Sequence, residues 1–343
     1  MKKYVLPNPS VDQKEADSII FLTEQYNKLC ESNALGKLGK KLGEIVPTLV
    51  KDTIFDLGMS ISQQDLYKKI MDYVSSGFKD VQEIAAKYTL PRNTIIKKIN
   101  SIVPENHITD PSEFCLVRSY DIAKLVSKFK DGGMLTALLE GGATGAFGFV
   151  GLVPNIVLCT FISFRAVQTI ATFYGYDVQS SPSELVIASE VFANALSPST
   201  CRDDELGDVV GKIMAFGEVA ALKDAIAKPY AQMALEGGLP RLIVKLRALA
   251  NGAARKGLEK AGQKGLEENM FKNVLTQIGK GLDKKTVGKL IPGLGAIIGA
   301  AFDMRQMKTV ITFADIFYQK RFLLEKEHNI DVLIGPPHDV IDI

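Results

Sequence analysis

Apolar residues recur at the three- and four-residue spacing of an α-helix along most of the chain, and period-two alternation bounded by turn residues is scarce. The first apolar stripe, which includes Ile19, Leu22 and Leu29, predicts a helix over about 14–30, followed by a Gly- and Lys-rich turn over 33–43. Further helices are predicted over about 44–57, 64–76, 81–87, 94–102 and 111–130. The pattern therefore predicts an all-α fold, a multi-helix bundle with little or no sheet.

The most apolar part of the chain, residues 141–164, contains no charged residue. Its length would allow a membrane-spanning helix, which needs about 20 apolar residues. Its Leu, Ile, Val and Phe residues favour insertion, whereas several glycines together with Pro154 and Asn155 oppose it. The balance is near zero, so this segment is expected to be a broken helix that either packs inside the protein or enters a bilayer.

A second Gly-rich apolar stretch covers residues 290–302 and is too short to span a membrane. Both stretches carry a proline close to a glycine and small residues four positions apart, a spacing that lets two helix backbones approach closely. We therefore expect two Gly-rich helical hairpins packed together, whose packing or insertion depends on nine residues: Gly141, Gly142, Gly145, Gly151, Pro154, Pro292, Gly293, Gly295 and Gly299.

The chain is nearly neutral as a whole, but one segment is strongly cationic. Lys and Arg number 41 and Asp and Glu number 39, so no global basic field indicates nucleic-acid binding. Residues 81–102 have a helix-turn-helix shape, but a short hairpin packed on its own domain is favoured over DNA binding because no wider basic face accompanies it. Residues 241–289, in contrast, are strongly cationic and helical in pattern. They suit either a helix lying on an anionic membrane or a solvated face over a core stripe, and the sequence leaves both open.

The chain lacks the residue patterns of conventional enzymes. No GxSxG, P-loop, HExxH or Gly-rich dinucleotide motif occurs. The three histidines and four cysteines have no metal-ligand spacing, so no cofactor and no metal are expected, and the cysteines are interpreted as reduced thiols. The N-terminus lacks the apolar run of a secretory signal, which favours a cytoplasmic protein.

Charged and polar residues border the apolar stretches and form the candidate polar cluster. Its members are Glu140, Asn155, Arg165, Asp177, Asp303 and Arg305, and the charged residues Arg118 and Asp121 are considered together with them. Charges next to buried segments must be paired or reach water, so a structural ion-pair network is favoured. A ligand or lipid-headgroup site and a carboxylate-based hydrolase remain alternatives, and no catalytic residue is assigned.

The two Gly-rich regions also resemble the signatures of the EcsC family, over roughly residues 80–328. The first signature, at about 138–177, is matched by Leu138-Leu139-Glu140-Gly141-Gly142-Ala143-Thr144-Gly145, Gly151-Leu152-Val153-Pro154, Phe164-Arg165-Ala166 and Tyr174-Gly175-Tyr176-Asp177. The second, at about 290–322, is matched by Ile291-Pro292-Gly293-Leu294-Gly295-Ala296, Gly299-Ala300 and Arg321-Phe322. The resemblance implies a bacterial helical domain of poorly defined role, whose namesake is encoded beside an ABC transporter, and it brings no accepted catalytic residues. Where the family often has an acid after the first proline, this chain has Asn155.

These observations predict an N-terminal helical region over 1–103, an EcsC-like helical domain over 111–329 and an extended tail over 330–343. The leading functional hypothesis is a helical interaction or lipid-binding protein of the EcsC type that associates peripherally or conditionally with membranes, and it includes a link to a transporter or secretion process. Its expected partners are a membrane surface or lipid, with a protein partner possible, and not nucleic acid. The alternatives are a membrane-disrupting effector and an unrecognised hydrolase on a helical scaffold.

Overall fold

The computed structural model describes residues 3–43, 75, 77–83, 89–131, 152–196, 205–217, 239–275 and 304–335, with the backbone alone for 32–43, 152–158 and 304–306. Every regular element in these ranges is an α- or 3₁₀-helix, and no strand occurs among them. The predicted all-α, multi-helix fold is therefore confirmed.

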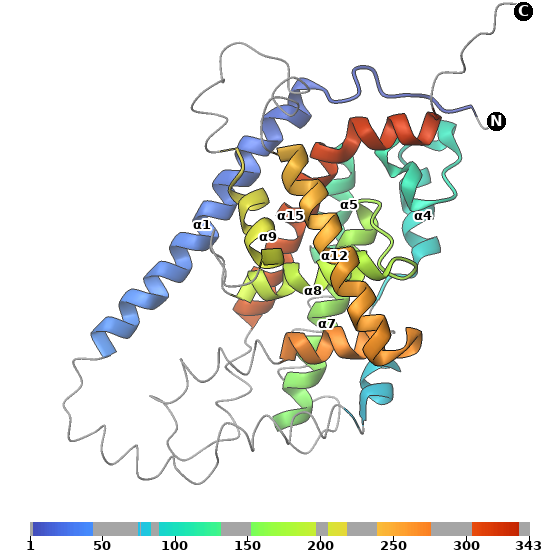
Figure 1. Ribbon diagram of the computed structural model, residues 1–343. Helices are drawn as coiled ribbons and strands as arrows, with labels where there is room; N and C mark the ends of the chain where they lie inside the picture. The colour runs from blue at the N-terminus through green and yellow to red at the C-terminus, as the bar shows by residue number, and fades with distance from the viewer. Residues whose placement is uncertain are drawn as a thin grey trace, which may run out of the picture.

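Helix α15 (Met304–Ile334) forms the centre of the bundle. It contacts α7 (Leu152–Phe173), α8 (Pro182–Leu196), α9 (Glu205–Ala215), α5 (Ser119–Asp131) and α1 (Gln13–Gly43), which surround it along its length. Figure 1 shows α15 passing through the middle of the other helices. A helix enclosed in this way has little solvent face, so its charged residues must find partners inside the protein.

Helix α12 (Leu239–Ala261) lies outside this centre, against α8 and α9. Its buried side chains, Ile243, Leu246, Ala250 and Ala254, recur at the spacing of one helix face. A short 3₁₀-helix, η3 (Gln263–Gly265), follows, and residues 266–275 are again helical. In this last segment Phe271 contacts Phe161 of α7 edge-to-face, with ring centroids 4.7 Å apart.

The N-terminal side of the fold consists of α1, α4 (Arg92–Asn100) and two 3₁₀-helices, η1 (Pro104–Asn106) and η2 (Pro111–Leu116). Ile19 and Tyr26 of α1 and Ile95 of α4 belong to the same apolar core as α7, α8 and α15. This core therefore joins residues from both sides of position 103.

Three predicted helix boundaries are wrong. Residues 33–43 continue α1 instead of forming a turn, because a glycine inside a helix weakens it by only about 1 kcal/mol. The segment predicted as one helix over 111–130 is η2 followed by α5, separated by the extended residue Val117. Residues 330–334 are helical and not extended, because Ile330 and Leu333 pack against Cys115 and Leu116 of η2.

The predicted Gly-rich hairpins lie almost wholly outside the described residues. Only residues 152–164, the end of the first stretch, are described; they form the start of α7, which continues as one helix to Phe173. Among the described helices, none combines the length and the apolar character that crossing a membrane requires.

Candidate functional site

Of the predicted polar cluster, the side chains of Arg165 and Asp177 are described, and each makes its own ion pair. Arg165 bonds Glu267, with Nη2 3.0 Å from Oε1, and Gln168 supports the same carboxylate. Asp177 accepts a 2.7 Å bond from Arg92. Both residues border a cavity of only about 10 Å³, room for about one water molecule. No ligand of useful size fits between them.

The remaining predicted site residues are not brought together by the described structure. Arg118 pairs with Glu15 and Asp121 with Lys124, on another side of the fold. Pro154 and Asn155 lie in the first turn of α7 and Arg305 in the first turn of α15, without described side chains. The rest lie outside the described residues: Glu140, Gly141, Gly142, Gly145, Gly151, Pro292, Gly293, Gly295, Gly299 and Asp303.

The sequence interpretation missed a row of buried charges on α15. Lys320, Arg321 and Lys326 are fully buried, and Glu325 is nearly so. Lys320 donates to the Thr23 hydroxyl of α1 at 2.7 Å and to the Phe216 carbonyl after α9 at 2.6 Å. These hydrogen bonds link α15 to α1 and to the residues that follow α9. Arg321 lies in the second of the two signatures and at i, i+4 spacing from Glu325, but this spacing is equally typical of an exposed helix face.

Arg321 is the centre of one buried ionic group. Its two terminal nitrogens donate to both oxygens of Glu184, at 2.6 and 2.8 Å, and its Nε donates to Glu325 at 3.0 Å. Glu325 also accepts from Arg247 of α12 and from the Tyr176 hydroxyl. Burial opposes the guanidinium charge, but the carboxylates of Glu184 and Glu325 raise the pKa of Arg321 well above its ordinary value. Two cations thus face two anions, and the group is neutral overall.

A second buried pair links the two ends of the described chain. Lys326 donates to Glu15 of α1 at 2.6 Å, and the same carboxylate accepts from Arg118 and from the backbone N–H of Ser119. Burial lowers the pKa of Lys326 below its usual value, and Glu15 partly offsets this effect. The capture of the Ser119 N–H explains why a new helix begins there.

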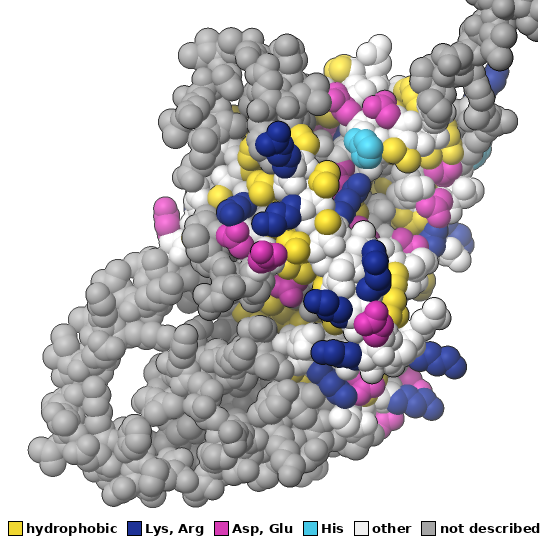
Figure 2. Space-filling view, in the orientation of Figure 1, with side chains coloured by type: hydrophobic (Ala, Val, Ile, Leu, Met, Phe, Trp, Pro, Cys, Tyr) yellow, Lys and Arg dark blue, Asp and Glu magenta, His cyan; other side chains and the backbone are white. Residues whose placement is uncertain are grey.

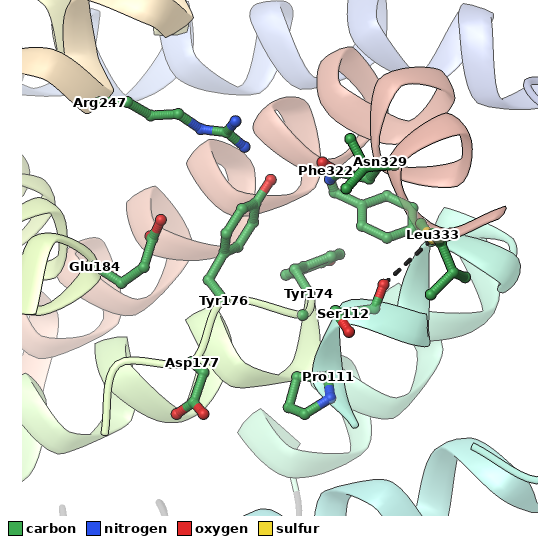
Figure 3. A pocket seen from close by; sticks show the side chains of 13 residues that line it. Pro111, Ser112, Tyr174, Tyr176, Asp177, Glu184, Arg247, Phe322, Asn329 and Leu333 are labelled. Atoms are coloured by element: carbon green, nitrogen blue, oxygen red, sulfur yellow. Dashed lines mark hydrogen bonds between the residues drawn. The ribbon is translucent and has the colours of Figure 1, made fainter. Parts of the chain in front are cut away.

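A cleft of about 420 Å³ opens beside the Arg321 group. Figure 3 shows Arg247, Tyr176 and Glu184 gathered at one side of it, and Phe322, Tyr174 and Leu333 at the other. One side is therefore charged and the other mainly apolar. Its volume lies in the range of small-molecule sites, about 300–1,000 Å³.

The turn after α7 builds one wall of this cleft. Gly175 has a φ of +89°, and a Cβ there would lie 2.7 Å from the carbonyl oxygen of Pro111. Only glycine allows this turn to pack against η2. The preceding residue, Tyr174, is fixed by a 2.9 Å hydrogen bond from its hydroxyl to Asp315, which also pairs with Lys130. The turn that carries Tyr174 and Tyr176 is consequently held rigidly between η2 and α15.

A single thiol is found among the described residues that line the cleft. Cys115, the thiol at its edge, has a pKa raised to about 12 by burial, so it is protonated at neutral pH and a poor nucleophile. No histidine is found among the described residues that line the cleft. No group of three or more His, Cys, Asp or Glu side chains that could hold a metal ion occurs in the described part of the chain.

The outer face of α12 and the turn after it form a separate cationic surface, which we call the α12 stripe. It consists of exposed residues on one side of the helix and just beyond it: Arg241, Lys245, Arg255, Lys256, Lys260 and Lys264. None of the six makes an ion pair within the described structure, and Glu259 is the only acid among them. Figure 2 shows Lys and Arg side chains following the course of α12 down the molecule, with few acids between them.

The comparisons with known proteins place the chain. The sequence model of the EcsC protein family matches residues 25–323, which contain α4, α5, α7, α8, α9, α12 and most of α15. No curated protein and no solved structure matches the chain. Residues 174–177 and 321–322, which carry the ends of the two signatures, meet around the cleft and its buried ionic group. The chain therefore belongs to the EcsC protein family.

Proposed function

We propose that this protein binds anionic membrane surfaces peripherally, through the α12 stripe. The observation that carries the proposal is the set of six exposed cations with no ion-pair partner in the described structure. A basic residue near an anionic bilayer contributes about 1 kcal/mol, and the attraction falls off within a Debye length. A few of the six acting together would give reversible, salt-sensitive binding.

The burial of the apolar face of α12 determines how this helix binds. Leu246 and Ala250 are fully buried against α8 and α9, so this face is not free to enter a lipid layer. The only large apolar side chain exposed on α12 is Val244, with 67% of its surface accessible. These features support adsorption by charge, without insertion of α12, and association that depends on lipid composition and ionic strength.

The test is cosedimentation of the full chain with phosphatidylcholine vesicles, with and without phosphatidylglycerol. We expect binding only to the anionic vesicles at about 50 mM salt and its loss at about 500 mM, where screening is strong. Replacing Arg255, Lys256, Lys260 and Lys264 with Gln should abolish binding.

A matched control removes the same number of charges elsewhere. Lys28, Lys97, Lys98 and Lys128 are exposed and lie outside the α12 stripe, so changing them to Gln should leave most of the binding intact. Failure of the unmodified chain to sediment with anionic vesicles, or equal losses in the two quadruple variants, would contradict the proposal.

A further inference from the structure

We propose that the 420 Å³ cleft binds a single-chain amphiphile with a carboxylate or phosphate head, which Arg247 receives. This inference goes beyond the surface adsorption proposed above and does not depend on it, because the cleft and the α12 stripe are made of different residues.

Arg247 has hydrogen-bonding capacity that the described protein groups do not use. Its hydrogen bonds within the described structure run through Nη2 to Glu325 alone, which leaves Nη1 and Nε without a protein acceptor. The side chain is 38% exposed and lines the cleft. A partly exposed guanidinium with N–H groups still free can donate charge-assisted hydrogen bonds to a carboxylate or phosphate.

The acids near Arg247 already form ion pairs with arginines of the protein. Both oxygens of Glu184 accept from Arg321, and Glu325 is shared between Arg321 and Arg247. Asp177, which also lines the cleft, is paired with Arg92. An anionic head at Arg247 would therefore meet a neutral group of two cations and two anions. Arg247 has free N–H donors, whereas the carboxylates of Glu184 and Glu325 already accept hydrogen bonds from the protein. This combination favours a ligand that accepts hydrogen bonds.

The side of the cleft opposite Arg247 is mainly apolar. Phe322, Tyr174 and Leu333 lie there, away from Arg247 (Figure 3). Val332, also part of the lining, is 68% exposed and leaves an apolar edge open to solvent. Tyr174 and Phe322 are each only 2% exposed and form the back of this side, so an alkyl chain would cover the more exposed Leu333 and Val332. Covering them removes apolar surface from water, at roughly 25 cal/mol for each Å². The division of the cleft thus matches a molecule with one polar end and one apolar chain.

The experiment measures binding in solution by titration calorimetry, with the full chain, no vesicles and ligands below their micelle concentrations. Dodecanoate carries a carboxylate head and dodecyl phosphate a phosphate head. The ligand that binds with the higher affinity identifies the preferred head group. Acetate and inorganic phosphate test each head without a chain, and dodecyltrimethylammonium tests the chain with the opposite charge. We expect binding of at least one of the first two and of none of the other three. No binding of either anionic amphiphile, or equal binding of the cationic one or of a head alone, would overturn the inference.

Variants locate the site. Arg247→Met should weaken binding about ten- to a hundredfold, the loss expected for charge-assisted hydrogen bonds. Lys245→Met, on the exposed side of the same helix, is the matched control and should bind as the unmodified chain does. Because Arg247→Met also disturbs Glu325, Val332→Glu is a second test. It changes an exposed residue and should weaken binding by placing a negative charge at the cleft edge.

The two proposals fail separately. Arg247→Met and Val332→Glu should still sediment with anionic vesicles, and the quadruple α12-stripe variant should still bind the amphiphile. Unchanged amphiphile binding in both Arg247→Met and Val332→Glu would overturn the assignment of the cleft, whatever the vesicle experiment shows.

Discussion

Single buried charges determine how the helices of this protein are held together. Arg321 has no exposed surface, yet its guanidinium makes three hydrogen bonds to two carboxylates and stacks 3.9 Å from the ring centre of Tyr176. A buried ion pair gives little net stability compared with apolar residues of the same shape. Removing one member is costly, however, because the other charge stays buried without compensation.

Arg321→Met is therefore expected to lower the free energy of unfolding by about 3–5 kcal/mol. The substitution keeps a long side chain but leaves Glu184 with no charged partner in the described structure and Glu325 with Arg247 alone. Urea unfolding followed by circular dichroism measures the change. Arg255→Met is the matched control, because Arg255 is exposed and has no ion-pair partner among the described residues, and its free energy of unfolding should stay within about 0.5 kcal/mol of that of the unmodified chain. A loss below about 1 kcal/mol for Arg321→Met would contradict this account.

At this scale the sequence identified candidate residues but not their partners. Arg165 and Asp177 were predicted to converge with other residues at helix ends, and each instead pairs separately, Arg165 with Glu267 and Asp177 with Arg92. Those partners are about a hundred positions away, and spacing along one helix carries no information on contacts at such separations. Arg321 was quoted in a family signature, but nothing in its spacing indicated burial, since that depends on the helices packed around it.

Elements were predicted more successfully than residues. Helix periodicity correctly predicted the all-α class of the fold, because apolar spacing is a property of each segment by itself. It failed where two segments interact. The last turn of α15 is helical because Leu333 packs near η2, and the break before α5 is stabilised by Glu15 of α1. Such contacts join elements far apart in sequence and so lie beyond any local pattern.

The N-terminal arm, residues 3–11, shows how a segment without regular structure is held by a few bonds. Asn106 of η1 accepts from the Val5 N–H at 2.7 Å and donates to the Val5 carbonyl at 3.0 Å. Tyr4 donates to Glu113 at 2.8 Å, a bond that, together with burial, raises the pKa of Tyr4 to about 12. The arm lies near the C-terminal end of α15 (Figure 1).

Asn106→Ala should release this arm. It removes both bonds to Val5, each of which contributes about 0.5–1.5 kcal/mol, so unfolding should become easier by about 1–3 kcal/mol. Hydrogen exchange measured by mass spectrometry should show faster exchange for a peptide covering residues 3–11 and unchanged exchange in α7. Ser101→Ala, which removes an exposed bond to Lys98 close by, serves as the control and should leave the arm protected. Unchanged arm exchange in Asn106→Ala would show that other contacts hold it.

For the whole molecule, the buried tyrosines make stability depend on alkaline pH. Tyr174, Tyr176 and Tyr318 are essentially fully buried. Burial raises the pKa of each well above its ordinary value, and the nearby carboxylates Asp315, Glu325 and Glu184, respectively, raise them further. In the unfolded chain a tyrosine releases its proton near pH 10. Above that pH the folded state therefore holds more protons than the unfolded state, and stability falls as the pH rises.

One group acts in the opposite direction over a lower range. The folded pKa of Lys326 is lowered from its usual 10.5, so the unfolded state binds more protons between the folded pKa and 10.5. Stability therefore rises with pH through that window and gains nothing more from this lysine above it. The net loss from the tyrosines should accordingly be clearest above about pH 10.5.

Each tyrosine with a raised pKa contributes about 1.4 kcal/mol of lost stability per pH unit, so the three together give at most about 4 kcal/mol per unit. A protein of ordinary stability, about 5–15 kcal/mol, should then unfold within a few pH units above 10. Tyrosinate absorbance and far-ultraviolet circular dichroism, followed in one titration, should show the three buried tyrosines ionising only as helical signal is lost. Tyr318→Phe should retain stability at neutral pH, because its buried hydroxyl has no hydrogen-bond partner within the described structure, and should reduce the alkaline slope by about one third. Complete tyrosine ionisation with the helical signal intact would contradict the predicted coupling between burial and alkaline unfolding.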